Sequence, residues 1–162
     1  MKLLFRQRFL SFFDSYDIYD EYGNVYFKVE GKLSWGHKFH IYDKNEKFAA
    51  VLKQRMITFL PKFDIYDSNE NLIGTIAKKL TVFFPKYEID MNGWQINGDF
   101  MHWDYSITDG TRTIAKISKQ LFRLMDTYMI EVDEENALSA LLVVISIDAI
   151  NCSRSRVVSI ND

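Results

Sequence analysis

The feature that most constrains this chain is a short internal repeat, aromatic-x-Ile, which occurs six times. Successive isoleucines of the repeat lie 23, 24, 24, 18 and 23 residues apart. Side chains two positions apart in a β-strand point to the same face, so each copy predicts a strand that buries both of its apolar residues. The copies are Tyr16/Ile18, Phe39/Ile41, Phe63/Ile65, Tyr87/Ile89, Tyr105/Ile107 and Tyr128/Ile130.

A turn and a second strand follow each of the first five copies. The turn runs are EYGN, KNEK, SNEN, MNG and GTR, each preceded by an aspartate. Asp, Asn and Gly favour turns because they bond their own backbone or tolerate a positive φ. The second strands are VYFKVEG, FAAVLKQ, LIGTIAKK, WQING and TIAKISK. Each unit therefore predicts a β-hairpin.

The hairpins account for ten strands, and the N-terminal segment and residues 128–132 raise the number to about twelve. Residues 156–160 are a further candidate strand. A twisted sheet of this size tends to curl, and closing it into a barrel removes its exposed edges. The sequence thus predicts a mainly β fold, a closed antiparallel barrel. A barrel of twelve strands is too wide for its own side chains to fill.

An apolar segment near the C-terminus is the candidate filling. Of residues 137–150, 11 of 14 are apolar. Asp133 is a suitable N-cap, and Glu134 and Glu135 suit the positive end of a helix dipole. The β-branched run 143–145 leaves a strand possible, but length and the start signal favour a helix. A helix that is apolar all round is buried, and this one is too short to span a bilayer, so we expect it inside the barrel.

With the hairpin repeat and the terminal helix, the sequence resembles the LURP-one-related (YxjI-like) family. The resemblance is carried by YDIYDEYGN, FHIYDKNEK, FDIYDSNEN, FFPKYEID and ALSALLVVISID, and it spans nearly the whole chain. It implies a tubby C-terminal-domain-like fold, a twelve-stranded barrel enclosing a hydrophobic helix, as one domain over residues 1–162. Proteins with this fold include tubby, which binds phosphoinositides, and the phospholipid scramblases. No local motif transfers tubby's lipid-contacting residues to this chain.

Composition excludes several classes of function. The formal charge of −2 rules out a broadly basic nucleic-acid binder. Cys152 is the single cysteine, and the N-terminus lacks the pattern of a signal peptide, so we expect a cytoplasmic protein without a transmembrane segment. No GxSxG, P-loop or GxGxxG motif occurs, which predicts a noncatalytic protein without a cofactor. His37 and His40, three apart in a strand, face opposite sides, so we expect no metal there.

Acidic residues gather in two places. Asp14, Asp17 and Asp20 lack the spacing of a calcium loop, so we assign them to turns and strands. The acids just before the apolar segment are sparser than the calcium-binding segment of the scramblases, and we assign them to helix capping.

Basic residues recur at the far ends of the second strands. They are Lys28, Lys53, Arg55, Lys78, Lys79, Lys116 and Lys119. Equivalent places in stacked hairpins should lie near one rim of a barrel, where ammonium and guanidinium groups hold a phosphate or an anionic lipid headgroup. This predicts a noncatalytic binding module, peripheral at the membrane if the ligand is a lipid. The alternative for these residues is a solvated edge, where Lys prevents strand-to-strand aggregation.

A second hypothesis is a structural or protein-interaction domain that contacts a partner through exposed aromatic residues. The candidates are Trp35, Phe59 and Phe83. Asp148 is a separate candidate, since a carboxylate in an apolar helix is costly unless it is hydrogen-bonded or close to water. We expect it at the barrel mouth, bonded to a strand backbone, with proton transfer as the alternative role.

Overall fold

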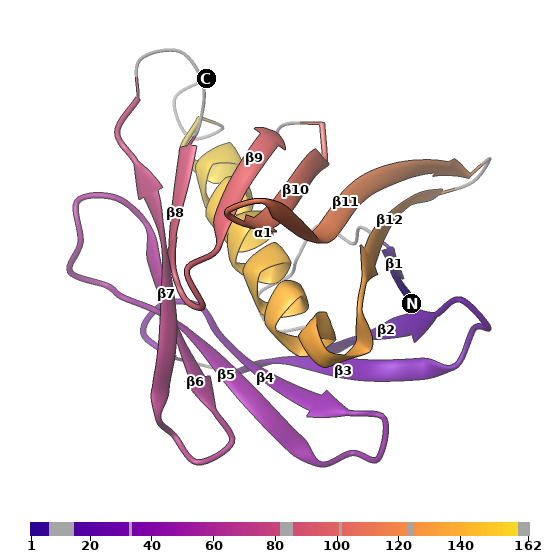
Figure 1. Cartoon of the computed structure of the whole chain (residues 1–162). Coiled ribbons are helices and arrows are strands. Elements are labelled where there is room, and N and C mark those ends of the chain that lie inside the picture. Colours follow the sequence, from indigo (N-terminus) through magenta and orange to yellow (C-terminus); the bar gives the residue numbers. More distant parts are fainter. Residues whose placement is uncertain (7–14, 33, 82–85, 101, 123–124, 159–162) are drawn as a thin grey trace.

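The fold is a single twelve-stranded sheet wrapped around one helix (Figure 1). The structure is a computed structural model that describes residues 1–6, 15–32, 34–81, 86–100, 102–122 and 125–158. The strands are β1 (Lys2–Arg6), β2 (Ser15–Asp20), β3 (Val25–Lys32), β4 (Lys38–Asp43), β5 (Phe48–Gln54), β6 (Lys62–Asp67), β7 (Leu72–Lys79), β8 (Lys86–Asp90), β9 (Gln95–Asp99), β10 (Asp104–Asp109), β11 (Arg112–Phe122) and β12 (Met125–Val132).

The strands form an antiparallel sheet in the order β8-β7-β6-β5-β4-β3-β2-β1-β12-β11-β10-β9. β1 pairs with both β2 and β12, so the N-terminal strand joins the two halves of the sheet. The prediction of a mainly β barrel with about twelve strands around a C-terminal helix is confirmed. The barrel is nearly closed, and its two edges are β8 and β9.

The prediction of a hairpin is wrong for one of the five units. In the described part of the chain, the strands with Tyr87/Ile89 and WQING do not pair with each other. β8 pairs with β7 and β9 pairs with β10. The turn between them carries Met91 and Trp94, whose side chains are buried. Met91 packs against Gly74, where an added Cβ would lie 2.6 Å from the Met91 Cβ. The turn between the two edge strands therefore contributes two side chains to the core.

The helix is longer than predicted. A 3-10 turn, η1 (Glu134–Asn136), leads into α1 (Ala137–Val158), so the strand alternatives for residues 143–145 and 156–158 are wrong. Residues 159–160 of the second candidate strand lie outside the described residues. Asp133 occupies the N-cap of η1 in extended conformation, but its side chain makes no capping bond.

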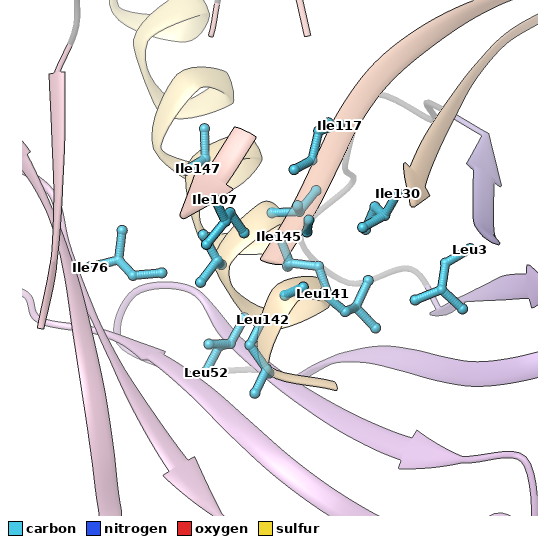
Figure 2. Close-up of a cluster of buried hydrophobic side chains, with 14 of the residues drawn as sticks. Leu3, Leu52, Ile76, Ile107, Ile117, Ile130, Leu141, Leu142, Ile145 and Ile147 are labelled. Atoms are coloured by element: carbon cyan, nitrogen blue, oxygen red, sulfur yellow. The ribbon is translucent and has the colours of Figure 1, made fainter. Parts of the chain in front are cut away.

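The core lies between the helix and the inner face of the sheet. Figure 2 shows Leu141, Leu142 and Ile145 of α1 among side chains from strands all round the barrel. In the repeat, the isoleucine and the aromatic residue both point inward, as Phe39, Ile41, Phe63 and Ile65 do at 0–1% exposure. The expected burial of the repeat is confirmed except at Tyr16 and Ile89, which are partly buried against the core, and alternate residues form the outer face.

Candidate functional site

The two ends of the barrel differ in chain connectivity and in chemistry. We call the end with the hairpin turns the turn rim, formed by residues 20–24, 43–47, 67–71, 90–94, 109–112 and 133–136. The opposite end, where one hairpin leads to the next, includes residues 34–37, 55–61 and 80–81 and the adjoining ends of β3 to β8, and we call it the connection rim. The helix runs between them, since Tyr26 bonds Glu134 of η1, just before its start, and Tyr87 bonds Asn151 in its C-terminal half.

The turn rim is acidic and internally hydrogen-bonded. In the turns at 20–24, 43–47 and 67–71, Oδ1 of the first aspartate accepts two backbone N–H bonds. In one turn Asp67 Oδ1 accepts from Asn69 N at 2.8 Å and Asn71 N at 2.9 Å. These bonds, led by that of the Asn71 side chain, hold the pKa of Asp67 below its usual value. Asp20, Asp43 and Asp67 thus have a structural role in their turns, as expected for Asp20.

The connection rim carries the opposite charge. On β3 to β8 its cations are Lys32, Lys38, Lys53, Arg55, Lys62, Lys78, Lys79 and Lys86, against the acids Glu30, Asp64 and Glu88, and the ends of β9 and β10 add the acids Asp99 and Asp104. On the turn rim, the acids are Asp20, Glu21, Asp43, Glu46, Asp67, Glu70, Asp90, Asp109, Asp133, Glu134 and Glu135, against the cations Lys44, Lys47 and Arg112. The turn rim is therefore strongly acidic and the β3–β8 part of the connection rim is basic, in a chain whose formal charge is −2.

Three lysines of the connection rim form a row on the outer face. Lys32 pairs in register with Lys38, and Lys38 with Lys53, on the adjacent strands β3, β4 and β5. Their inward-facing neighbours Phe39 and Leu52 are buried, which puts the lysines on the outer face. Directly opposed residues of paired strands have Cβ atoms about 4.5–5.5 Å apart, and like charges there repel. Lys32 is neutralised by Glu30, whose Oε2 lies 2.6 Å from its Nζ, whereas no acid of the described residues lies within ion-pairing distance of Lys38 or Lys53.

Asp64 lies beside this row of lysines and forms an ion pair with Arg55. Asp64 is opposite Lys53 in register, and its side chain is only 8% exposed. Arg55 Nε donates to Asp64 Oδ2 at 2.6 Å, while Oδ1 is buried without a hydrogen-bond partner among the described residues. The contact through Nε leaves the Nη groups of Arg55 unbonded to Asp64. We call Lys32, Lys38, Lys53, Arg55 and Lys62 the basic cluster.

The structure brings together only part of the predicted set. Lys53 and Arg55 belong to the basic cluster, and Lys78 and Lys79 lie two strands away at the end of β7, where Lys79 pairs with Glu88 at 3.3 Å. Lys28 lies further down β3, opposite Tyr42, and pairs with Glu30 at 3.5 Å.

The two predicted residues on β11 lie apart from the basic cluster. Lys116 is opposite Glu131 and lines a shallow hollow with Met1, Lys2, Glu21 and Asp133. Lys119 is further along β11, opposite Tyr128. A single ring formed by all seven predicted residues is therefore not what the structure shows.

Three residues of the basic cluster, Lys32, Lys38 and Lys62, were not predicted from the sequence. Lys32 ends a second strand, whereas Lys38 and Lys62 begin first strands. The signal for the latter was present in the connections themselves, where a lysine precedes the aromatic residue in HKF, PKF and PKY. Antiparallel pairing puts the start of one strand next to the end of its neighbour, so both positions reach the same rim.

Large apolar side chains are exposed at the tips of the connection rim. The exposed fractions are 100% for Ile57, 92% for Phe59, 91% for Trp35 and 78% for Leu80. Phe83, the third aromatic candidate, lies outside the described residues. Patches of exposed apolar side chains mark interaction sites more often than chance, whereas scattered ones do not.

A second group of polar residues lies inside the barrel. Burial raises the pKa of Asp148 to about 7, and Tyr105, whose Oη has no hydrogen-bond partner among the described residues, has a pKa well above 10 because it is buried near Asp148. Tyr87 Oη donates to Asn151 Oδ1 one helical turn beyond Asp148. Asp148 was expected near the helix end, at the barrel mouth, but α1 continues for ten residues beyond it, so Asp148 lies in the middle of the helix, in a buried setting of tyrosines.

His37 and His40 lie on opposite faces of the sheet. His37 stacks on Phe39 and Phe63, both inward, with ring centroids 6.4 Å from each, whereas His40 packs with Tyr42 and Phe48 on the outer face. Within the described ranges, no three His, Cys, Asp or Glu side chains gather as metal ligands would. The part of the chain that the structure describes contains no helix of the length and apolarity that a membrane span requires.

This chain belongs to the LURP-one-related family, whose sequence model matches residues 1–147. It is 28% identical over 152 residues to the uncharacterised protein YxjI of Bacillus subtilis, and the match covers 93% of each chain. Its fold is similar to the X-ray structure of a protein from Arabidopsis thaliana, with a TM-score of 0.59, 12% identity and coverage of 91% of this chain and 90% of that one.

Proposed function

We propose that this LURP-one-related chain is a noncatalytic binding module for a phosphate-bearing anion, either a lipid headgroup or a small ligand, held at the connection rim. The observation that carries the proposal is the lysine row beside the Arg55–Asp64 pair. Holding like charges in register is unfavourable unless an anion neutralises them, and ammonium groups form strong charge-assisted bonds with phosphate oxygens.

Asp64 supports this assignment as a positioning residue. Its bond to Nε fixes the plane of the Arg55 guanidinium while the Nη groups stay unbonded to the carboxylate. Such a guanidinium matches the geometry of two phosphate oxygens, whereas Lys38 and Lys53 contribute point charges on flexible stems. The cluster therefore combines one oriented donor with several adaptable ones.

The charge contrast of the two rims supports binding at one end only. An anion approaching the turn rim meets an excess of carboxylates, whereas the connection rim attracts it. If the anion is a lipid, the module is peripheral, on the anionic cytoplasmic leaflet.

The proposal is tested with two arms that separate the sources of the anion. One arm measures co-sedimentation with phosphatidylcholine vesicles with and without phosphatidylserine, and the other measures binding of inositol hexakisphosphate by calorimetry. We expect binding in at least one arm, weakening steeply with salt because exposed charges are screened. Absence of binding in both arms at low salt contradicts the proposal.

The alternative function is a protein-interaction or structural domain, which the exposed Trp35 and Phe59 favour. It predicts a reproducible protein partner whose binding is lost in Trp35→Ala and Phe59→Ala but resists high salt. Salt-resistant capture with no anion binding in either arm would select this alternative.

A further inference from the structure

The connection rim has exposed apolar side chains at its tips and cations beside them, and the proposed function uses only the cations. Ile57, Phe59 and Trp35 are almost fully exposed, and Leu80 is mostly so. The connections that carry them, residues 34–37 and 55–61, contain no acidic residue. The basic cluster lies just below them on the ends of β3 to β6. The order along the barrel axis is thus apolar tips first and cations next.

The connections are held side by side. Gln54 N donates to His37 O at 2.8 Å, and His37 N donates to Gln54 Oε1 at 3.1 Å. Gly36, with φ +92°, packs so closely on Met56 that an added Cβ would collide with its Sδ. Lys78 N donates to Pro61 O at 3.1 Å, which ties the next strand to the same group. The apolar tips therefore belong to one supported surface.

A bilayer interface has the same order of chemistry. Apolar side chains enter the acyl boundary, tryptophan prefers the headgroup level, and lysine stems extend to phosphates. From this match we infer that the connection rim docks on an anionic lipid bilayer, with Trp35, Ile57 and Phe59 inserted and the basic cluster at the headgroups. This inference rests on the proposed function and commits its anion to a membrane lipid.

Two other occupants fit the surface less well. A second copy meeting it rim to rim would bring two cationic clusters together, and like charges repel. A protein partner would have to present a strongly acidic surface with separate pockets for tips that project from different connections. A bilayer adapts to the tips without such pockets.

Intrinsic fluorescence tests the insertion directly. The chain has three tryptophans, of which Trp94 and Trp103 are buried in the core at 5% and 7% exposure. Only Trp35 can change environment without unfolding, so the signal reports the connection rim. With phosphatidylserine-containing vesicles, we expect a blue shift of the emission and quenching by brominated phosphatidylcholine. Trp35→Phe should abolish both changes while the protein still co-sediments.

A pair of double variants tests the contribution of the apolar tips. Ile57→Ser/Phe59→Ser should weaken vesicle binding at least about tenfold, because serine does not gain the free energy that an apolar side chain gains on moving from water into the bilayer. The matched control, Tyr22→Ser/Leu72→Ser, removes exposed apolar side chains from the opposite end, at 84% and 53% exposure, and should leave vesicle binding unchanged. Neither pair should change the affinity for inositol hexakisphosphate.

The outcomes separate this inference from the function on which it rests. Binding of inositol hexakisphosphate without vesicle binding, or vesicle binding with unchanged Trp35 emission, overturns the insertion and retains the anion site. A blue shift that appears with protein concentration alone, without vesicles, replaces the bilayer with a second copy. Failure of both the vesicles and the soluble phosphate overturns the proposed function itself.

Discussion

The turn rim and the connection rim are built from the same five repeated units, yet their charged groups have different partners. At the turn rim, carboxylates such as Asp20 and Asp43 accept backbone hydrogen bonds within their own turns. At the connection rim, Lys38 and Lys53 oppose each other in register and form no ion pair within 4.0 Å among the described residues, although Asp64 is opposite Lys53 on the next strand. Charges with internal partners stabilise a fold, whereas neighbouring like charges cost stability and become favourable when a ligand neutralises them. We therefore propose binding at the connection rim, whereas the turn aspartates support the fold.

The stability contributions of the buried Asp148 and of the exposed turn aspartates, such as Asp67, should depend on pH in opposite directions. Burial raises the pKa of Asp148 to about 7, so its contribution to stability is complete below its unfolded value near 3.8 and is lost as pH rises through about 7. Asp148→Asn should therefore stabilise the protein at pH 8, by as much as about 4 kcal/mol, and have little effect at pH 4. Denaturant unfolding at both pH values measures this, with Glu135→Gln as an exposed control. Equal effects at the two pH values would contradict the assignment.

Charge reversal should separate the two rims in binding. Each Lys near an anionic surface contributes about 1 kcal/mol, so Lys38→Glu/Lys53→Glu/Lys62→Glu should weaken vesicle binding by at least about a hundredfold. Lys44→Glu/Lys47→Glu makes the same kind of change at the turn rim and should leave it unchanged. Co-sedimentation of both variants provides the measurement. Equal losses would show that binding follows net charge alone.

Removing a turn carboxylate should reduce stability without affecting binding. Asp67→Ala leaves the Asn69 and Asn71 N–H groups without their acceptor. We expect the thermal midpoint to fall by about 2–4 °C at pH 7. Since the pKa of Asp67 is lowered in the folded state, this contribution is lost as pH falls through that lowered value, and the two proteins should then converge. An unchanged difference under acid conditions would contradict the role of the ionised carboxylate.

The smallest effect concerns the backbone of the same turns. Glu46 and Glu70 have φ of 59° and 64°, in the left-handed region, where the first hairpin has Gly23 at 85°. Because a side chain is unfavourable there, Glu70→Gly should stabilise by about 0.5–1 kcal/mol. Gly23→Ala, whose Cβ would meet no atom within 4 Å, should destabilise through the backbone alone. Chemical denaturation measures both changes, and a loss of stability in Glu70→Gly would contradict this view.

Local patterns predicted most of the fold. The period of two in Phe39/Ile41 and Phe63/Ile65 determines which face is buried, and the turn residues determine where each strand ends. The opening between β8 and β9, whose turn buries Met91 and Trp94, was missed because no local pattern reports it. The helix was predicted too short because its last residues are more polar than the buried part.

The candidate site was predicted less completely, because the face to which each lysine points depends on its place in the strand and on how the strands pair. Lys53 follows buried Leu52 and therefore points outward. Lys78 and Lys119 lie two residues after buried Ile76 and Ile117, and so fall on the inward-facing side of their strands. Lysines at similar places in the repeat therefore do not reach one face. Lys38 and Lys62 join the cluster only through strand pairing, and the burial of Asp64 follows from its neighbours.

Hydrogen exchange on vesicles tests the central claim most directly, because it reads both rims in one experiment. With phosphatidylserine-containing vesicles, we expect exchange to slow at amides of residues 34–37 and 55–60 and to stay unchanged in the turns at 20–24, 43–47 and 67–71. Protection of the turn rim, or equal protection of both rims, would contradict the assignment of binding to the connection rim.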